Sequence, residues 1–184
     1  MTIRTQPPQT ACRKILHAAL RRRLPRAAHM PSLRGAASTG HPLPLYRLGA
    51  GALKGKAPLS RARKIGWYVP VIGGAVPGLA ILRARAKGPE YAGLIEGPLA
   101  QRLLDAALFV EGDLADAEAV FEPRLLQIPS LQALLLWMQR PGKSLFVALA
   151  EARQAPDLEL EDDLREIAAR AKKRRRRSRR GAKA

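Results

Sequence analysis

Residues 65–82 read IGWYVPVIGGAVPGLAIL, a run of eighteen residues without a charged side chain. By length alone, such a run is a candidate for one membrane-spanning helix. Pro70, Pro77 and the glycines of the run would interrupt that helix repeatedly, and basic residues on both flanks give no orientation signal. We therefore predict two strands, at residues 67–72 and 79–85, joined by the turn-forming GGAVPG.

The segment that follows, EGPLAQRLLDAALFVEG at residues 96–112, has the pattern of an amphipathic helix. Proline is favoured at the first helical position and glycine just past the last one, so Pro98 and Gly112 mark the expected ends. The apolar face that helical spacing predicts comprises Leu99, Leu103, Ala107 and Val110, widened by Leu104 and Leu108. We expect this face to cover a sheet.

Further strands are expected downstream. RLLQI at 124–128 and SLFVAL at 144–149 are short apolar runs, and RPGK at 140–143 has proline and glycine placed for a tight turn. LQALLLWM at 131–138 fits either a helix capped by Ser130 or a strand. We predict a strand, because the turn after it favours a hairpin.

The last apolar pattern lies in DLELEDDLREIAARAKK at residues 157–173. Leu160, Leu164, Ile167 and Ala171 share one helical face. Glu161 with Arg165, and Glu166 with Arg170, are spaced for ion pairs one turn apart. Acidic residues come first and basic residues last, which matches the dipole of a helix.

These segments predict an α+β fold with one main helix packed on an antiparallel sheet of four to five short strands. The expected organisation has four parts: a disordered basic arm or targeting segment at 1–44, a single domain at 45–155, a C-terminal helix at 156–171 and a disordered polybasic tail at 172–184. A chain of 184 residues is long enough for one such domain with flexible ends.

Charge is distributed in blocks along the chain, whose formal net charge is +18. Residues 1–89 hold seventeen Lys and Arg and no acidic residue, since the first acid is Glu90. Residues 90–171 hold all fifteen acids and seven bases, and nine bases follow. Blocks of like charge repel one another and are typical of segments that bind polyanions.

The N-terminal block allows several interpretations. It is acid-free and rich in Arg, Ser and Pro, and Leu16, Leu20 and Leu24 recur every four residues beside basic residues, so a basic helix could form on an anionic surface. That composition is typical of an organellar transit peptide. The alternatives are a polyanion-binding arm, or a leader preceding a functional start at Met30. A secretory signal is not expected, because the apolar run at 15–20 is too short.

The tail has the composition of a segment that binds phosphate backbone. Arginine dominates it, and the planar guanidinium can hold a phosphate through two hydrogen bonds. The candidate nucleic-acid-binding residues are Lys172, Lys173, Arg174, Arg175, Arg176, Arg177, Arg179, Arg180 and Lys183. Such contacts carry no sequence information, and no aromatic residue lies among them to stack on bases. A nuclear address and attraction to anionic lipid remain alternatives.

Other chemistry is mostly excluded by composition. The only cysteine, Cys12, allows no intramolecular disulfide, and the histidines all lie within the first 41 residues, so the body cannot hold a Ser-His-Asp arrangement. GALKGK at 51–56 lacks the spacing of a phosphate-binding loop. Lys143 beside Ser144 is ordinary turn composition. The acidic clusters at 111–122 and 161–163 lack calcium-loop spacing. We expect no catalytic residues, cofactor or metal.

These observations favour a non-enzymatic accessory protein. We expect its basic arms to contact RNA or DNA backbone without sequence preference, and its body to act as a protein-interaction module. The alternative is a membrane-associated accessory protein that uses residues 65–82 and their basic flanks. The expected location is cytoplasmic, or organellar if residues 1–40 are a transit peptide.

Overall fold

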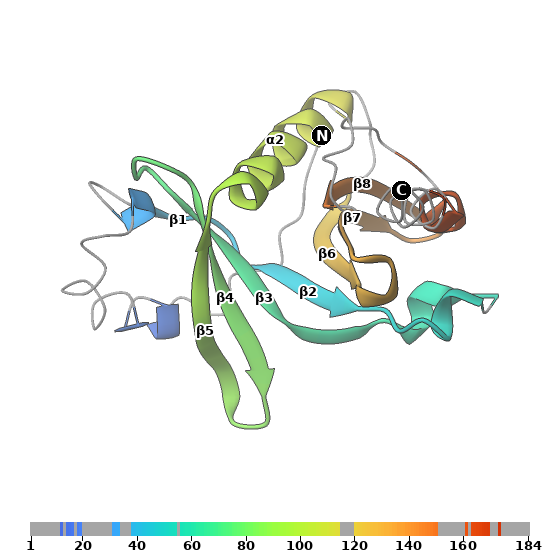
Figure 1. Cartoon of the computed structure of the whole chain (residues 1–184), viewed down its shortest axis with the longest axis horizontal. Helices are drawn as coiled ribbons and strands as arrows, with labels where there is room; N and C mark the ends of the chain where they lie inside the picture. The colour runs from blue at the N-terminus through green and yellow to red at the C-terminus, as the bar shows by residue number, and fades with distance from the viewer. Residues whose placement is uncertain are drawn as a thin grey trace, which may run out of the picture.

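The computed structural model describes residues 12, 14–16, 18, 19, 31–33, 38–54, 56–114, 120–150, 161, 163–169 and 173. Its main feature is one sheet of eight strands, accompanied by a single long helix, α2, and short helical turns (Figure 1). The strands are β1 Ser38–Thr39, β2 Leu43–Arg47, β3 Arg63–Ile72, β4 Gly78–Arg85, β5 Gly88–Glu96, β6 Glu122–Ile128, β7 Ala133–Arg140 and β8 Lys143–Ala150. The helix is α2 Pro98–Asp113, and the 3₁₀ turns are η1 Pro31–Leu33, η2 Ala52–Lys54, η3 Pro58–Arg61 and η4 Pro129–Leu131.

The sheet joins two antiparallel meanders through one parallel pair of strands. Its order is β5-β4-β3-β2-β6-β7-β8, with β1 paired to β3 beside β2. All the pairs are antiparallel except β2 with β6, where Leu45 lies opposite Leu125. A parallel pair needs a long crossover connection, and here β3, β4, β5 and α2 make up that connection. The pairing therefore brings residues 45–47 beside residues that follow them by eighty positions.

The predicted fold class is wrong, because the structure is mostly a large mixed sheet rather than one main helix on four or five antiparallel strands. Three causes are visible. The pattern LPLYR of β2 contains Pro44 and reads as a loop, and β5 lacks the regular alternation of buried and exposed residues that marks a strand. Finally, the β2–β6 pairing joins residues eighty positions apart, so no local sequence pattern predicts it.

The apolar run at 65–82 forms β3, a turn and β4, as predicted. Val69 lies opposite Ala80 in the antiparallel pair, and Gly73 in the turn adopts a φ of 86°, which favours glycine. Gly66 is required by the pairing itself, since an added Cβ would overlap the carbonyl oxygen of Leu82. Within the ranges that the structure describes, no helix is both long and apolar enough to cross a membrane.

The strand assignments downstream are also confirmed. Residues 133–140 form β7 rather than a helix, and β7 and β8 make a hairpin in which Trp137 lies opposite Phe146. Gly142 has a φ of 76° in the turn between them, so the RPGK prediction holds. RLLQI lies within β6, and Pro129 begins the 3₁₀ turn that follows.

Helix α2 begins at Pro98 as expected, but its buried face and its end differ from the prediction. The buried residues are Ala100, Leu103, Ala106 and Val110. Ala107 is exposed, and Leu108 is 68% exposed. Small alanines thus face the sheet and permit close packing. Gly112 lies inside the helix, which ends at Asp113.

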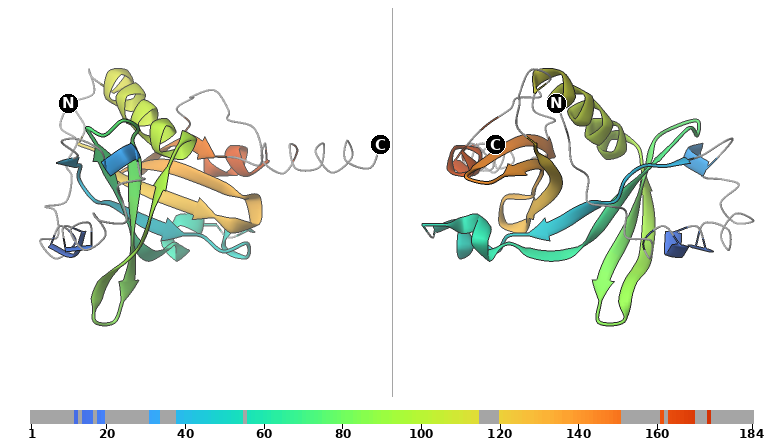
Figure 2. Two further views of the ribbon diagram at one scale, coloured as in Figure 1. Left: turned by 60° about the vertical axis from the view of Figure 1, so that its left-hand side comes forward. Right: turned by 180° about the vertical axis from the view of Figure 1, so that it is seen from behind.

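The sheet is covered by different segments on its two faces. Helix α2 lies across one face and contacts β4, β5 and β8 (Figures 1 and 2). Its buried side chains join a core with residues such as Leu79, Leu125 and Val147. The opposite face, called here the outer face, is buried in two separate clusters, one at the β3–β4 end and one over β6, β7 and β8.

The N-terminal segment closes the cluster at the β3–β4 end. Cys12 and Leu16, both fully buried, pack with Trp67, Val69 and Leu82. The described residues between 12 and 19 are helical. Leu16, which the sequence assigned to the apolar side of a helix on an anionic surface, thus packs on the protein's own sheet. Leu20 and Leu24 lie outside the described residues, as does Met30.

The C-terminal helix closes the other outer cluster. Its described turn covers residues 164–169, where Leu164, Ile167 and Ala168 are buried. Glu161 does not belong to this helix, because it exchanges two backbone hydrogen bonds with Phe146, at 2.7 and 2.9 Å. Leu160, Arg170 and Ala171 lie outside the described residues.

Candidate polyanion-binding surface

The predicted tail site lies almost wholly outside the described residues. Of its nine basic residues, only Lys173 is described, and it is helical and exposed. The assignment of Lys172, Arg174–Arg177, Arg179, Arg180 and Lys183 to nucleic-acid binding therefore stays a prediction. The described body nevertheless carries basic surface that the sequence analysis did not select.

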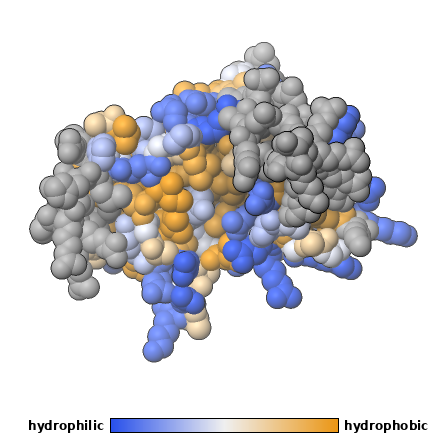
Figure 3. Space-filling view, viewed as in Figure 1, coloured by the Kyte–Doolittle hydropathy of each residue, from blue (hydrophilic) through white to orange (hydrophobic). Residues whose placement is uncertain are grey.

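The first basic surface is the β2–β3 connection, residues 47–64. It holds six Lys and Arg and no acidic residue. Arg47, Lys56, Arg61 and Arg63 are exposed. Turns η2 and η3 fold the connection, and the Ser60 hydroxyl donates a hydrogen bond of 2.8 Å to the Ala57 carbonyl at the start of η3. The connection is therefore a folded, cationic projection at one end of the molecule, where hydrophilic side chains extend outward (Figure 3).

Arg47 is oriented by the neighbouring strand. Its Nε and Nη2 atoms each donate to Oε1 of Gln127 at 3.2 Å. The Gln127 amide is neutral, so these bonds position the guanidinium without cancelling its charge. The β2–β6 pairing that places Arg47 opposite Gln127 thus also fixes one cation of the connection.

The second basic surface is the tip of the β4–β5 hairpin. Arg83, Arg85 and Lys87 are exposed there, and the same figure shows hydrophilic side chains projecting from the hairpin. Glu90 forms an ion pair with Arg85 at 2.8 Å, with both side chains more than half exposed. An exposed pair of this kind stabilises little, but it lowers the positive charge that the hairpin offers to a polyanion.

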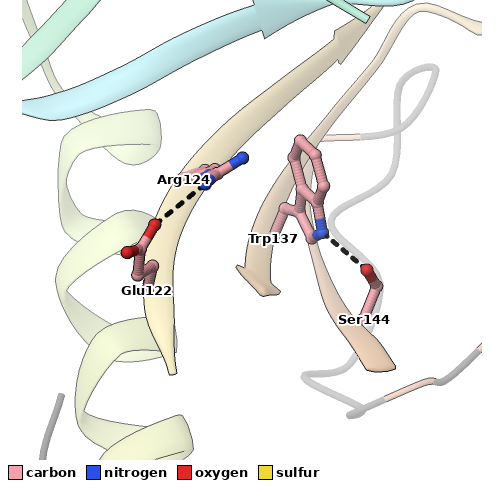
Figure 4. A network of polar contacts seen from close by, with 4 residues as sticks. All are labelled: Glu122, Arg124, Trp137 and Ser144. Atoms are coloured by element: carbon pink, nitrogen blue, oxygen red, sulfur yellow. Dashed lines mark hydrogen bonds and ion pairs between the residues drawn. The ribbon is translucent and has the colours of Figure 1, made fainter. Parts of the chain in front are cut away.

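A cation–aromatic cluster occupies the middle of the outer face. The Arg124 guanidinium lies 5.4 Å from the ring of Tyr46 and 5.2 Å from the ring of Trp137, and its Nη2 atom lies 2.8 Å from Glu122 Oε2. Figure 4 shows this ion pair beside the hydrogen bond of 3.0 Å that Trp137 Nε1 donates to Ser144 Oγ. Because Arg124 already has an acidic partner and two aromatic neighbours, its role is to hold the sheet surface together.

Lys64 lies close to this cluster, with Nζ 4.5 Å from the ring centroid of Trp67. Burial lowers the pKa of the Lys64 amine, and the positive charge of Arg124 adds to that effect, while Cys12 opposes it. The pairing register that joins Lys64 to Tyr46 contains a bulge, which is why sequence alternation did not reveal the cluster.

The acidic clusters do not converge. Glu111 and Asp113 are exposed at the end of α2, Glu122 pairs with Arg124, and Asp116 and Glu118 lie outside the described residues. Asp163 accepts a hydrogen bond of 2.7 Å from the backbone N–H of Arg165. Where the structure describes the chain, no three His, Cys, Asp or Glu side chains gather in a way that would hold a metal ion.

One open cavity of about 360 Å³ lies between the β2–β3 connection and the C-terminal helix. Its walls come from residues 56–60, from Ser144 and Phe146 of β8, and from residues 163–165. The rim carries the cations of Lys56 and Arg165, both exposed. The cavity therefore joins the folded basic connection to the helix that precedes the predicted basic tail.

Comparisons of this chain with protein-family models, with curated proteins and with solved structures find no significant match.

Proposed function

We propose that this protein is a non-enzymatic accessory protein that binds the phosphate backbone of RNA or DNA without sequence preference. The contact surface consists of the β2–β3 connection and the C-terminal tail. The observation that carries the proposal is the exposure of Arg47, Lys56, Arg61 and Arg63 on one acid-free, folded connection. Clustered exposed cations raise the local concentration of a polyanion and gain free energy by releasing its counterions.

The two parts of this surface contribute differently to binding in the proposal. The connection is held by η2, η3 and the Arg47–Gln127 bonds, so its cations are positioned before binding. The tail supplies nine further bases. Cations without base-edge contacts give affinity but no sequence readout, so any specificity belongs to a protein partner of the body.

The proposal places the protein in the cytoplasm, or in an organelle if its first 40 residues act as a transit peptide. The membrane-associated alternative through residues 65–82 is less favoured. Trp67, Val69 and Leu79 of that run are buried inside the protein, so they offer no apolar surface to lipid.

The test is the salt dependence of binding, measured by fluorescence anisotropy with labelled RNA, single-stranded DNA and duplex DNA. Log K should fall linearly with log salt concentration, and deletion of residues 172–184 should reduce the slope by about 5 to 7 if six to eight phosphates are lost. Replacing Lys56, Arg61 and Arg63 by Gln should reduce it by about 2 to 3.

The matched control replaces Arg83, Arg85 and Lys87 by Gln, which removes the same charge from the hairpin. The control should change the slope by less than the connection variant does. Equal effects of the two variants would mean that net charge, not the β2–β3 connection, governs binding. Retention of the full slope after both the tail deletion and the connection substitutions would refute the proposal.

A further inference from the structure

The cavity beside the β2–β3 connection has the composition of a site for one nucleotide. About 360 Å³ lies at the small end of the range for small-molecule sites. Pro58, Leu59 and Leu164 give it apolar walls, and Lys56 and Arg165 stand at its rim. This arrangement matches a nucleotide. Its flat, weakly polar base would lie against the apolar walls, and its charged phosphate would lie beside the cations at the rim.

Two hydroxyl groups give the cavity complementary hydrogen-bonding capacity. Ser144 Oγ accepts from Trp137 Nε1, so its own hydrogen can donate to a ligand. Ser60 donates its hydrogen to the Ala57 carbonyl, so its oxygen lone pairs can accept. The edge of a base carries hydrogen-bond donors and acceptors side by side. Ser144 can donate to an acceptor of the base, and Ser60 can accept from a donor.

The carboxylate of Asp163 helps to decide which part of a nucleotide enters. One of its oxygens accepts from the backbone N–H of Arg165, and the other remains an acceptor within the lining. A phosphate placed beside this carboxylate would be repelled. An amino group of a base or a hydroxyl of a sugar would be bound, which leaves the phosphate to Lys56 and Arg165 at the rim.

We infer that this cavity accepts one unstacked nucleotide of a single-stranded nucleic acid whose backbone lies on the surrounding cations. The inference rests on the proposed function and deepens it, because a base-accepting cavity makes the protein prefer strands with accessible bases. The wall at 56–60 belongs to the β2–β3 connection, which the proposal assigns to the backbone, and residues 163–165 lie at the start of the helix that precedes the tail, so a strand bound on the connection lies beside the cavity.

The experiment compares an intact single strand with an abasic strand of equal length and charge, using the full chain. The intact strand should bind about five- to tenfold more tightly, near the lower end of what one bound base contributes, because Phe146, the aromatic residue of the lining, is buried and offers no open ring face for stacking. Two separate substitutions, Ser60→Trp and Ala57→Trp, should each fill the cavity and abolish this preference, so that the intact and the abasic strand bind with about equal affinity. Both residues are exposed, so the larger side chain can be tolerated.

Ala50→Trp is the matched control, since Ala50 is an exposed residue of the same connection that does not line the cavity. It should leave the preference for the intact strand unchanged. A nucleoside monophosphate, added at constant ionic strength, should weaken binding of the intact strand to the level of the abasic strand. Displacement of the abasic strand as well would place the mononucleotide on cations outside the cavity and overturn the assignment.

The outcomes separate this inference from the proposed function. Equal affinity for the two strands, or a preference that survives both filling substitutions, would overturn the nucleotide cavity and leave backbone binding intact. Failure of both strands to bind at low salt would refute the proposed function itself, and the cavity assignment with it.

Discussion

The replacement Leu16→Ala tests whether the N-terminal segment is part of the fold. Leu16 is completely buried, with an exposed fraction of 0%. Its side chain packs with Trp67, Val69 and Leu82 on the outer face of the sheet. The substitution removes about three carbon groups, each worth about 0.8 kcal/mol when buried. With the added cost of a partly unfilled cavity, we expect a loss of about 3 kcal/mol.

Cys12 provides the assay, because it is the only cysteine of the chain and is buried beside Leu16 in the same cluster. Its thiol should react with an alkylating reagent only when the segment opens. A loss of about 3 kcal/mol corresponds to an opening equilibrium about 100-fold larger, and hence to labelling that is faster by up to the same factor. Lys14→Ala, at an exposed position of the segment, should leave the labelling rate within about twofold.

Two results would refute this reasoning. Labelling of the unmodified protein at the rate of a free thiol would show that the segment does not cover the sheet in solution. An equal effect of Leu16→Ala and Lys14→Ala would show that burial of the leucine contributes nothing to its docking.

Three further predictions concern stability. Gly66→Ala should destabilise the protein by about 3 kcal/mol or more, because its Cβ would overlap the Leu82 carbonyl oxygen, and an unchanged midpoint in urea would contradict the described pairing. Ser144→Ala should cost about 1 to 3 kcal/mol by leaving the Trp137 N–H without its acceptor, whereas Ser144→Thr, which keeps the hydroxyl, should cost less in the same titration. Burial raises the pKa of the Cys12 thiol in the folded protein, so as pH rises the unfolded chain loses that proton at a lower pH than the folded chain does. The free energy of unfolding should therefore fall as pH rises above about 8.5. A Cys12→Ala variant with the same pH dependence would contradict this prediction.

The sequence predicted those parts of the fold that local patterns determine. The β3–β4 hairpin follows from an uncharged run interrupted by proline and glycine, and the β7–β8 hairpin follows from RPGK at 140–143. The start of α2 at Pro98 follows from the preference of proline for that position. Each of these features depends on residues within about twenty positions of one another.

The sheet as a whole was not predictable in this way. The parallel pair of β2 and β6 joins residues about eighty positions apart, and the Leu45 and Leu125 positions carry no mark of their pairing. Without that pair, the sheet divides into two antiparallel pieces, β1–β5 and β6–β8, whereas the sequence analysis predicted one antiparallel sheet of four to five strands. The error in fold class therefore comes from this non-local pair together with two strands, β2 and β5, whose sequences lack a strand pattern.

Of the candidate site, the sequence predicted only the positive charge and not the position. An acid-free run from the N-terminus to residue 89 indicated a polyanion partner, but it did not distinguish the exposed cations of residues 56–63 from the tail. The cavity was not predictable, because its walls lie about a hundred positions apart at 56–60 and 163–165. They meet only because the C-terminal helix packs on the outer face of β6, β7 and β8.

A titration of the full chain with a short single-stranded oligonucleotide, followed by amide chemical shifts, tests the central claim most directly. The account predicts shifts concentrated at residues 56–63 and 163–169, which weaken as salt is raised and when Lys56, Arg61 and Arg63 are replaced by Gln. It also predicts that the amides of α2, on the opposite face of the sheet, stay unperturbed. Shifts confined to α2, or no shift at residues 56–63 at low salt, would contradict the claim that the β2–β3 connection is the folded part of the binding surface.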